Sequence, residues 1–264
     1  LGIDKNMPAR FLLPLIDQKA ASGFVNASLA LDQARAVKDI QEQELMRKAS
    51  HLNDMAMAEI THFFKEGVTE TDLAEQLKKI YRDLGADGLS FEPLFAFGSN
   101  AASGHHWPDD TRLKPGDCIL VDIGCTWEGY CSDMTRTFFY KNVTQHQQEV
   151  YHTVLKANEE AEKAVTPGIP LSSLDQIARG IITDKGYGSA FTHRLGHFIG
   201  LEDHEFGDVS SVSADRAVPG NIFSIEPGVY LENDMGVRVE DLVLVTDHGH
   251  EILNHFSKEL TVID

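Results

Sequence analysis

The segment CILVDIGCTWEGYCSDMTRTFFY, residues 118–140, contains two apolar stretches, each interrupted by an aspartate. The β-branched and aromatic residues of 118–126 and of 130–140 predict two strands. Trp127, Glu128 and Gly129 lie between them, where the glycine and the charged residue predict a short turn. We therefore expect the two strands to pair as an antiparallel hairpin.

The proposed hairpin places Asp122 directly opposite Asp133. Opposed side chains on one face have Cβ atoms about 4.5–5.5 Å apart. Two carboxylates at that separation repel each other unless a proton or a cation lies between them. A shared proton is one explanation, and we favour a bridging metal ion.

A second hairpin repeats this arrangement later in the chain. Residues 221–231 (NIFSIEPGVYL) and 236–245 (GVRVEDLVLV) predict two strands around a polar turn at 232–234. In this register Glu226 lies opposite Glu240, again within apolar strands. The two hairpins together supply four carboxylates.

Histidines cluster in HRLGHFIGLEDHE, residues 193–205, which contains His193, His197 and His204. One such histidine alone would be an ordinary surface residue. Gly196 and Gly200 leave room for close backbone approach, so the cluster predicts a fifth ligand. Four carboxylates and one imidazole suit Mn²⁺, Co²⁺ or Fe²⁺, and two ions about 3.5 Å apart would use all five ligands to activate water. This set predicts a hydrolase.

The chain contains three cysteines without CxxC spacing, which disfavours disulfides and a zinc-thiolate site and favours a reducing cytoplasm. The formal net charge of −18 disfavours a nucleic-acid partner. No apolar run approaches the roughly 20 residues of a membrane span, so we expect a soluble protein.

The helical pattern occurs twice. Helices are expected from about residue 38 to 65, and from Thr69, with Asp72 completing a capping box, to Gly85; the pattern recurs at about 145–165 and 171–186. Chance similarity between amphipathic helices is an alternative to a true repeat. Four pairs of identical residues nevertheless share one spacing: Gly67 and Gly168, Leu73 and Leu174, Ile80 and Ile181, Gly85 and Gly186. The repeat predicts an α+β fold of two helix-helix-strand halves, with a site between them.

Five motifs follow one another in the chain: FGSNAASGHHWP, VDIGCTWEGYCSDMTRTF, HRLGHFIGLEDHE, SIEPGVY and GVRVED. In these motifs the sequence resembles the catalytic domain of the creatinase, prolidase and aminopeptidase P family, metallopeptidase family M24. The resemblance implies the pita-bread fold, two pseudo-symmetric halves with a curved antiparallel sheet around a dinuclear metal site. It makes 36–264 the catalytic domain and 1–35 a linker or a remnant of an N-terminal domain.

The resemblance also implies roles for individual residues. The metal ligands would be Asp122, Asp133, His197, Glu226 and Glu240. The residues expected to act in catalysis are His105, His193, His204 and Glu226, and the substrate would contact His105, His193, His204 and Arg238.

Two features of the motifs leave questions open. His106 adjoins His105, so the sequence leaves open which of the two acts. Arg194 and Phe198 stand where the family often has glycine, and Phe198 predicts a narrower pocket.

The expected activity is hydrolysis of the N-terminal bond of short peptides, with proline at the second position. The cofactors would be two divalent ions, Mn²⁺ first and Co²⁺, Fe²⁺ or Zn²⁺ as alternatives, and the resemblance implies a homodimer. A methionine aminopeptidase, a catalytically silent peptide-binding module and a metal-free creatinase-type hydrolase are the other readings. The sequence does not separate dipeptidase from aminopeptidase action.

Overall fold

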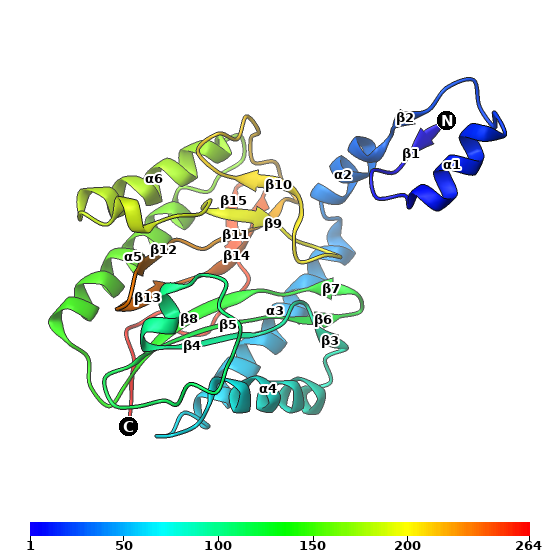
Figure 1. Cartoon of the computed structure of the whole chain (residues 1–264). Helices are drawn as coiled ribbons and strands as arrows, with labels where there is room; N and C mark the ends of the chain where they lie inside the picture. The colour runs from blue at the N-terminus through cyan, green and yellow to red at the C-terminus, as the bar shows by residue number, and fades with distance from the viewer.

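The computed structural model describes the whole chain, residues 1–264. Its body consists of two halves, each with a helix pair packed against a sheet (Figure 1). Helices α3 (Ile40–Thr61) and α4 (Glu70–Leu84) belong to the first half, and α5 (Gln145–Lys163) and α6 (Leu171–Asp184) to the second. This organisation confirms the predicted α+β class.

Each half has its own sheet. The first has the order β16–β8–β5–β4, in which only β16 pairs in parallel, and its strands are Leu94–Phe97 (β4), Cys118–Ile123 (β5), Met134–Tyr140 (β8) and Val262–Ile263 (β16). The second is an antiparallel sheet of order β10–β9–β11–β14–β15, with strands Gly196–Phe198 (β9), Glu205–Val209 (β10), Ile222–Ile225 (β11), Asp241–Thr246 (β14) and Gly249–Ile252 (β15).

Short ribbons extend these sheets. The pairs are β12 (Gly228–Leu231) with β13 (Met235–Arg238), and β6 (Cys125–Trp127) with both β3 (Gly88–Leu89) and β7 (Tyr130–Cys131). The helices and sheets bury two main apolar cores. One lies between α3, α4 and the first sheet. The other packs α5, α6 and the second sheet against the opposite face of the first sheet, through residues such as Leu120 and Phe139, so apolar burial also holds the two halves together.

The helix ends follow their capping signals. Thr69 and Asp72 form the predicted capping box of α4, and Gly85 ends that helix in the left-handed conformation at φ 83°. Thr144 and Gln147 form a second capping box at α5. Reciprocal side-chain bonds satisfy backbone N–H groups that a helix start leaves unpaired, so these positions fix where the helices begin.

Equivalent glycines of the two halves have the same geometry. Gly67 and Gly168 have φ of 82° and 85°, and their N–H groups donate to the carbonyls of Leu113 and Ala217, each at 2.8 Å. The same backbone turn and the same kind of hydrogen bond to a later loop are not expected of two unrelated amphipathic helices. The geometry therefore favours a true repeat over chance similarity.

The first hairpin differs from its predicted register. Asp122 lies opposite Thr135, so the prediction that it faces Asp133 directly was wrong. The loop consists of Glu128 and Gly129 alone, at φ 47° and 85°, which moves the register by two positions. Because side chains alternate with period two, this even shift keeps both aspartates on one face of the sheet.

The second hairpin has its predicted register. The pairs of β11 with β14 and of β12 with β13 follow one continuous alignment, and Glu226 and Glu240 lie opposite each other between them. The polar turn at 232–234 is also observed, with Asn233 at φ 59°.

Residues 1–36 project from the body at the upper right of Figure 1. They form β1 (Gly2–Ile3), α1 (Ala9–Asp17), β2 (Val25–Asn26) and α2 (Ser28–Ala36). Helix α1 buries no residue. The assignment of 1–35 as a linker or remnant stays a prediction. No helix has both the length and the apolar composition for crossing a membrane, and the three cysteines are buried and free.

Candidate metal centre

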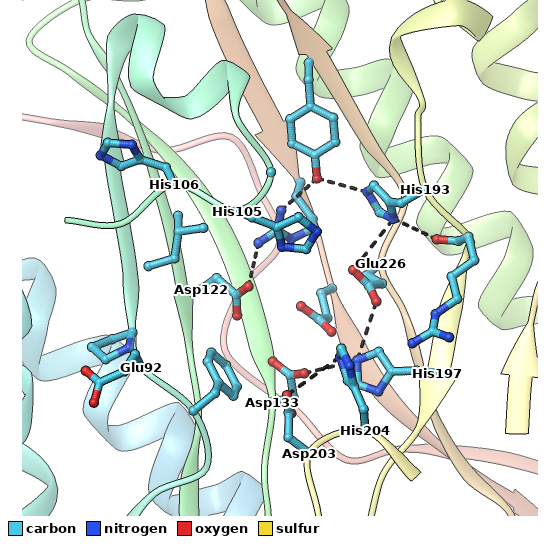
Figure 2. Close-up of a pocket in the computed structure, with 18 of the residues that line it drawn as sticks. Glu92, His105, His106, Asp122, Asp133, His193, His197, Asp203, His204 and Glu226 are labelled. Atoms are coloured by element: carbon cyan, nitrogen blue, oxygen red, sulfur yellow. Dashed lines mark hydrogen bonds and ion pairs between the residues drawn. The ribbon is translucent and has the colours of Figure 1, made fainter. Parts of the chain in front are cut away.

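The candidate site lies where the two sheets meet. The backbone N–H of Glu240 donates to the Thr135 carbonyl at 3.1 Å, which joins the second hairpin to β8. Beside this junction, potential ligand atoms of Asp133, His197 and Glu240 all lie within 4.8 Å of one another. Figure 2 shows Asp122 and Glu226 facing the same space. The structure therefore brings all five predicted ligands together.

His197 presents one defined ring nitrogen to this space. Its Nε2 lies 3.5 Å from Asp133 Oδ2 and 3.5 Å from Glu226 Oε1. Its Nδ1 lies 3.2 Å from the Phe198 carbonyl and donates to it, which leaves Nε2 with a lone pair. Burial lowers the pKa of His197 well below its usual value, which favours this neutral form.

The carboxylates carry oxygens that no donor satisfies. Asp122 Oδ1, Asp133 Oδ1 and Glu240 Oε1 are buried without a hydrogen-bond partner. Burial, followed by repulsion from the other carboxylates, raises the pKa of Asp133 and of Glu240 well above their usual values. Burial likewise raises the pKa of Glu226 to about 8. Divalent cations fit here, since they would satisfy these oxygens and offset the repulsion.

A supporting network holds the second oxygen of two of these carboxylates. Arg238 donates to Asp122 Oδ2, and Thr135 Oγ1 donates to Glu240 Oε2 at 2.6 Å. Arg238 also donates to Thr135 Oγ1 at 3.0 Å and to Tyr230 Oη at 2.7 Å. Each of the two carboxylates is thus fixed through one oxygen and offers the other to the site.

His193 belongs to the same network. Its Nδ1 donates to the Arg194 carbonyl at 2.7 Å, so its Nε2 accepts from Tyr230 Oη at 3.0 Å. Burial, followed by the nearby charge of Arg238, lowers the pKa of His193 to about 4. His193 is therefore a neutral ring whose two nitrogens are both engaged.

The structure distinguishes the two adjacent histidines of the first half. His105 turns toward Asp122 and makes no interaction with the residues drawn in Figure 2, whereas His106 turns away. His106 Nε2 lies 2.6 Å from Glu70 Oε2. His105 is thus the one free to meet a substrate.

His204 and Asp203 line the cavity from the segment after β9. The ring centroid of His204 lies 3.9 Å from that of His197, and its side chain is 58% exposed. Asp203 was not among the predicted residues, although its carboxylate lies with the two imidazoles in a group of potential ligands. No spacing rule singles it out within LEDHE.

Tyr230 was also missed, although a signal for it exists. Glu226, Gly228 and Tyr230 alternate along one arm of the second hairpin, whose register is continuous. Side chains two apart share a face, so Tyr230 had to lie on the face of Glu226. The alternation in the sequence could have identified it.

The prediction that Phe198 narrows the pocket was wrong. Phe198 is buried against Phe223, with ring centroids 5.6 Å apart, and does not line the cavity. Arg194 does line it, and pairs with Asp208 at 2.9 Å. The cavity measures about 760 Å³ and includes Trp107 in its wall. This size suits a short peptide.

Comparisons with known proteins identify a matching family. The model of metallopeptidase family M24 matches residues 44–247. An uncharacterised peptidase of Staphylococcus aureus (strain MW2) is 41% identical over 244 residues, which cover 92% of this chain and 70% of that protein.

Solved structures match over nearly the whole chain. The prolidase from Pyrococcus horikoshii OT3 has a TM-score of 0.96 and 33% identity, covering 98% of this chain and 75% of its own. The X-Pro aminopeptidase from Thermotoga maritima MSB8 has a TM-score of 0.94 and 32% identity, covering 99% and 75%. These matches confirm the predicted pita-bread fold.

Proposed function

Because the chain belongs to metallopeptidase family M24 and is a peptidase, we propose that it uses two divalent ions to remove the N-terminal residue from short peptides with proline at the second position. Mn²⁺ is the first choice of ion, with Co²⁺, Fe²⁺ and Zn²⁺ as alternatives. The proposed ligands are Asp122, Asp133, His197, Glu226 and Glu240.

The observation that carries this proposal is the set of unpaired buried oxygens. Asp122, Asp133 and Glu240 each keep one carboxylate oxygen without a donor, inside a cavity that also holds a neutral imidazole. Buried polar atoms in a folded protein are nearly always satisfied, so this set indicates missing cationic partners. Five ligands are more than one such ion takes alongside water, which supports a pair of ions.

Bound divalent ions supply Lewis acidity, which activates water and polarises a peptide carbonyl at neutral pH. Glu226 is suited to take the proton of the attacking water on Oε2, because its Oε1 accepts from Ser224 Oγ at 3.3 Å. In the metal-free protein burial raises the pKa of Glu226 to about 8, and bound cations would lower it, which would keep Oε2 in the carboxylate form that accepts a proton.

His105, His193 and His204 have different proposed roles in the reaction. His105 is placed to protonate the leaving nitrogen, because its ring is free of the interactions drawn in Figure 2. Both ring nitrogens of His193 are already hydrogen-bonded within the protein, so His193 would orient the substrate by packing against it and not by proton transfer. His204 is placed to donate to the carbonyl oxygen as negative charge develops there, and Arg238 keeps Asp122 oriented toward the metal site.

The preference for proline is supported by two of the similar solved proteins, one named a prolidase and the other an X-Pro aminopeptidase. Their names differ in the length of peptide that is cleaved, so both remain open here. A homodimer and a cytoplasmic location are further expectations from the resemblance and the cysteine content.

The metal assignment is tested with Asp133→Asn. We expect this variant to lose Mn²⁺-dependent turnover by at least about 100-fold while keeping its far-ultraviolet circular dichroism. Asp83→Asn, on the exposed side of α4, is the charge-matched control. Unchanged turnover in Asp133→Asn would remove the two-metal proposal.

The substrate assignment is tested with a peptide panel. Xaa-Pro dipeptides, longer Xaa-Pro peptides and Met-Xaa peptides are assayed with Mn²⁺, Co²⁺ and Zn²⁺. Turnover confined to Xaa-Pro bonds supports the proposal, and the two Xaa-Pro sets separate dipeptidase from aminopeptidase action. Turnover confined to Met-Xaa peptides would instead indicate methionine aminopeptidase specificity.

A further inference from the structure

Glu70, the first residue of α4, carries a fully buried carboxylate with four hydrogen bonds outside the metal centre. Its Oε1 accepts from the Phe97 N–H at 2.8 Å and from Asn100 Nδ2 at 3.0 Å. Its Oε2 lies 2.6 Å from His106 Nε2 and accepts from the Asp109 N–H at 3.1 Å. One side chain thus binds a loop of the chain at four points.

The position of Glu70 suits a buried negative charge. The N–H groups at a helix N-terminus are positively polarised, which stabilises a carboxylate in the first turn. Thr69 and Asp72 already cap α4 reciprocally, so the helix does not need Glu70 for capping. We therefore attribute the four hydrogen bonds of Glu70 to holding the segment 97–109 in place.

The bound loop forms part of the cavity wall through residues 104–107. His105 and Trp107 flank His106, and Trp107, which is 72% exposed, lines the cavity. Gly104 and His105 form a turn that the His106 N–H closes by donating to the Ser103 carbonyl at 3.1 Å. Figure 2 shows His105 and His106 turned in opposite directions. Because Glu70 holds the His106 ring on the side of α4, the His105 ring is turned toward the metal site.

The loop also rests on the network behind the metal centre. A Cβ atom on Gly104 would lie 3.3 Å from Cζ of Tyr230, so the backbone there packs closely against that ring. Tyr230 in turn contacts His193 and Arg238. The loop is therefore held from the Glu70 side and supported on the cavity side.

We propose that Glu70 and His106 form a clamp that positions His105 and Trp107 against the substrate cavity. Glu70 and His106 are then positioning residues for the peptidase reaction, and the catalytic part of this inference rests on the role proposed above for His105. A glutamine at position 70 could not replace the carboxylate, because it has one accepting oxygen for donors that occupy two.

The activity test compares His106→Leu with His106→Gln. The leucine removes the donor to Glu70, whereas the glutamine Nε2 can take the place of the imidazole Nε2. We expect His106→Leu to lower kcat by about 10- to 100-fold with a smaller change in KM, because the reacting groups remain but are misplaced. His106→Gln should restore most of kcat, and metal content should stay the same in both variants.

Glu70→Gln is the second variant and should resemble His106→Leu. Glu75→Gln is its matched control, since Glu75 lies on the same helix, is exposed and pairs with Lys78. This control should leave kcat unchanged.

A fluorescence test reports on the clamp without any substrate. The chain has two tryptophans, so Trp127→Phe leaves Trp107 as the only tryptophan, whose emission is excited selectively at wavelengths that tyrosine does not absorb. In that background we expect His106→Leu and Glu70→Gln to lower the fluorescence anisotropy of Trp107 and to increase its quenching by acrylamide. Glu75→Gln should change neither quantity.

Equal anisotropy in the clamp variants and their parent would overturn the proposal. A lowered anisotropy with unchanged kcat would overturn it as well, because the loop would then be ordered by Glu70 without positioning His105. Absence of peptidase activity in the unmodified, metal-loaded protein would count against the proposed function instead, and the anisotropy would still decide whether the clamp exists.

Discussion

The hydroxyl of Thr135 connects two of the residues that prepare the site. It donates to Glu240 at 2.6 Å and accepts from Arg238 Nε at 3.0 Å, and Arg238 holds Asp122 in turn. Thr135 is fully buried, so no water can replace its hydroxyl without rearrangement. A side chain that we do not expect to bind metal therefore orients carboxylates that we do expect to bind it.

Thr135→Val tests this role at nearly constant volume. We expect the affinity of the metal-free protein for Mn²⁺ to fall by about 10- to 100-fold, as is typical when a hydrogen bond behind a ligand is lost. Isothermal titration calorimetry measures the change. Thr153→Val, in α5, is the control, because that buried hydroxyl bonds only to the helix carbonyl of Glu149. Equal Mn²⁺ affinities in the two variants would contradict the role of Thr135.

Alternation along strands was enough to predict the four carboxylates but not the contacts between them. Asp122 and Asp133 were predicted on one face, and they share it, although the Glu128–Gly129 loop moves the pairing by two positions. Glutamate at positive φ is not a residue that signals such a turn, so its length could not be read from the sequence. The hydrogen bonds of Thr135 to Glu240 and Arg238 join residues more than 100 positions apart, so they can be known only from the folded structure.

Strand β9 is the shortest element that carries a proposed ligand. Its three residues pair with β10 on one side and touch β11 on the other, and His197 is the middle one. A Cβ atom on Gly196 would lie 1.8 Å from the Ser224 carbonyl oxygen of β11. The position of His197 thus depends on a glycine that lets two strands approach closely.

Gly196→Ala should therefore displace β9. We expect a loss of about 1–3 kcal/mol in the free energy of unfolding, together with reduced metal content, since the added methyl has no space. Urea denaturation and metal analysis measure the two effects. Gly180→Ala in α6 is the matched control, because nothing lies within 4 Å of its added Cβ. It should stabilise the protein by about 0.5–1 kcal/mol. A fully stable, fully metal-loaded Gly196→Ala protein would show that β9 tolerates the shift.

Elements with local signals were the predictable ones. The start of α4 at Thr69 and its end at Gly85 follow from capping chemistry within a few residues of each boundary. Strand β9 has no such signal, because a three-residue strand shows no periodicity and its glycine is explained only by β11. His197 was predicted from the cluster of histidines and from the resemblance, and its strand was not.

The two halves meet at a junction that contains a shared apolar core and buried charged groups. Arg136 crosses this junction from β8, donating to Asp241 at 2.7 Å and to the Glu240 carbonyl at 2.6 Å. Buried ion pairs contribute little net stability after desolvation, although they fix the relative position of the parts they join. The proposed ligands come from both halves, so ions bound there would add a further link.

This link should make stability depend jointly on metal and pH. In the metal-free protein, burial raises the pKa of Glu226 from 4.5 to about 8. Between these values the folded state holds a proton that the unfolded chain has released. The stabilisation from this group is complete below its unfolded pKa of 4.5 and is lost as the pH rises through about 8. Divalent ions take the place of such protons, so their binding strengthens over the same range.

We therefore expect the difference in Tm between the Mn²⁺-loaded protein and the protein in excess chelator to grow from about pH 6 to about pH 8. With free Mn²⁺ at about 100 times its Kd, ligand binding adds about 2.7 kcal/mol, or about 5–10 °C in Tm for a chain of this size. Differential scanning fluorimetry across the pH series measures the difference. Asp133→Asn should flatten the dependence, because it removes a carboxylate shared by the site. A Tm difference independent of pH in the unmodified protein would mean that cations and protons do not compete for these oxygens.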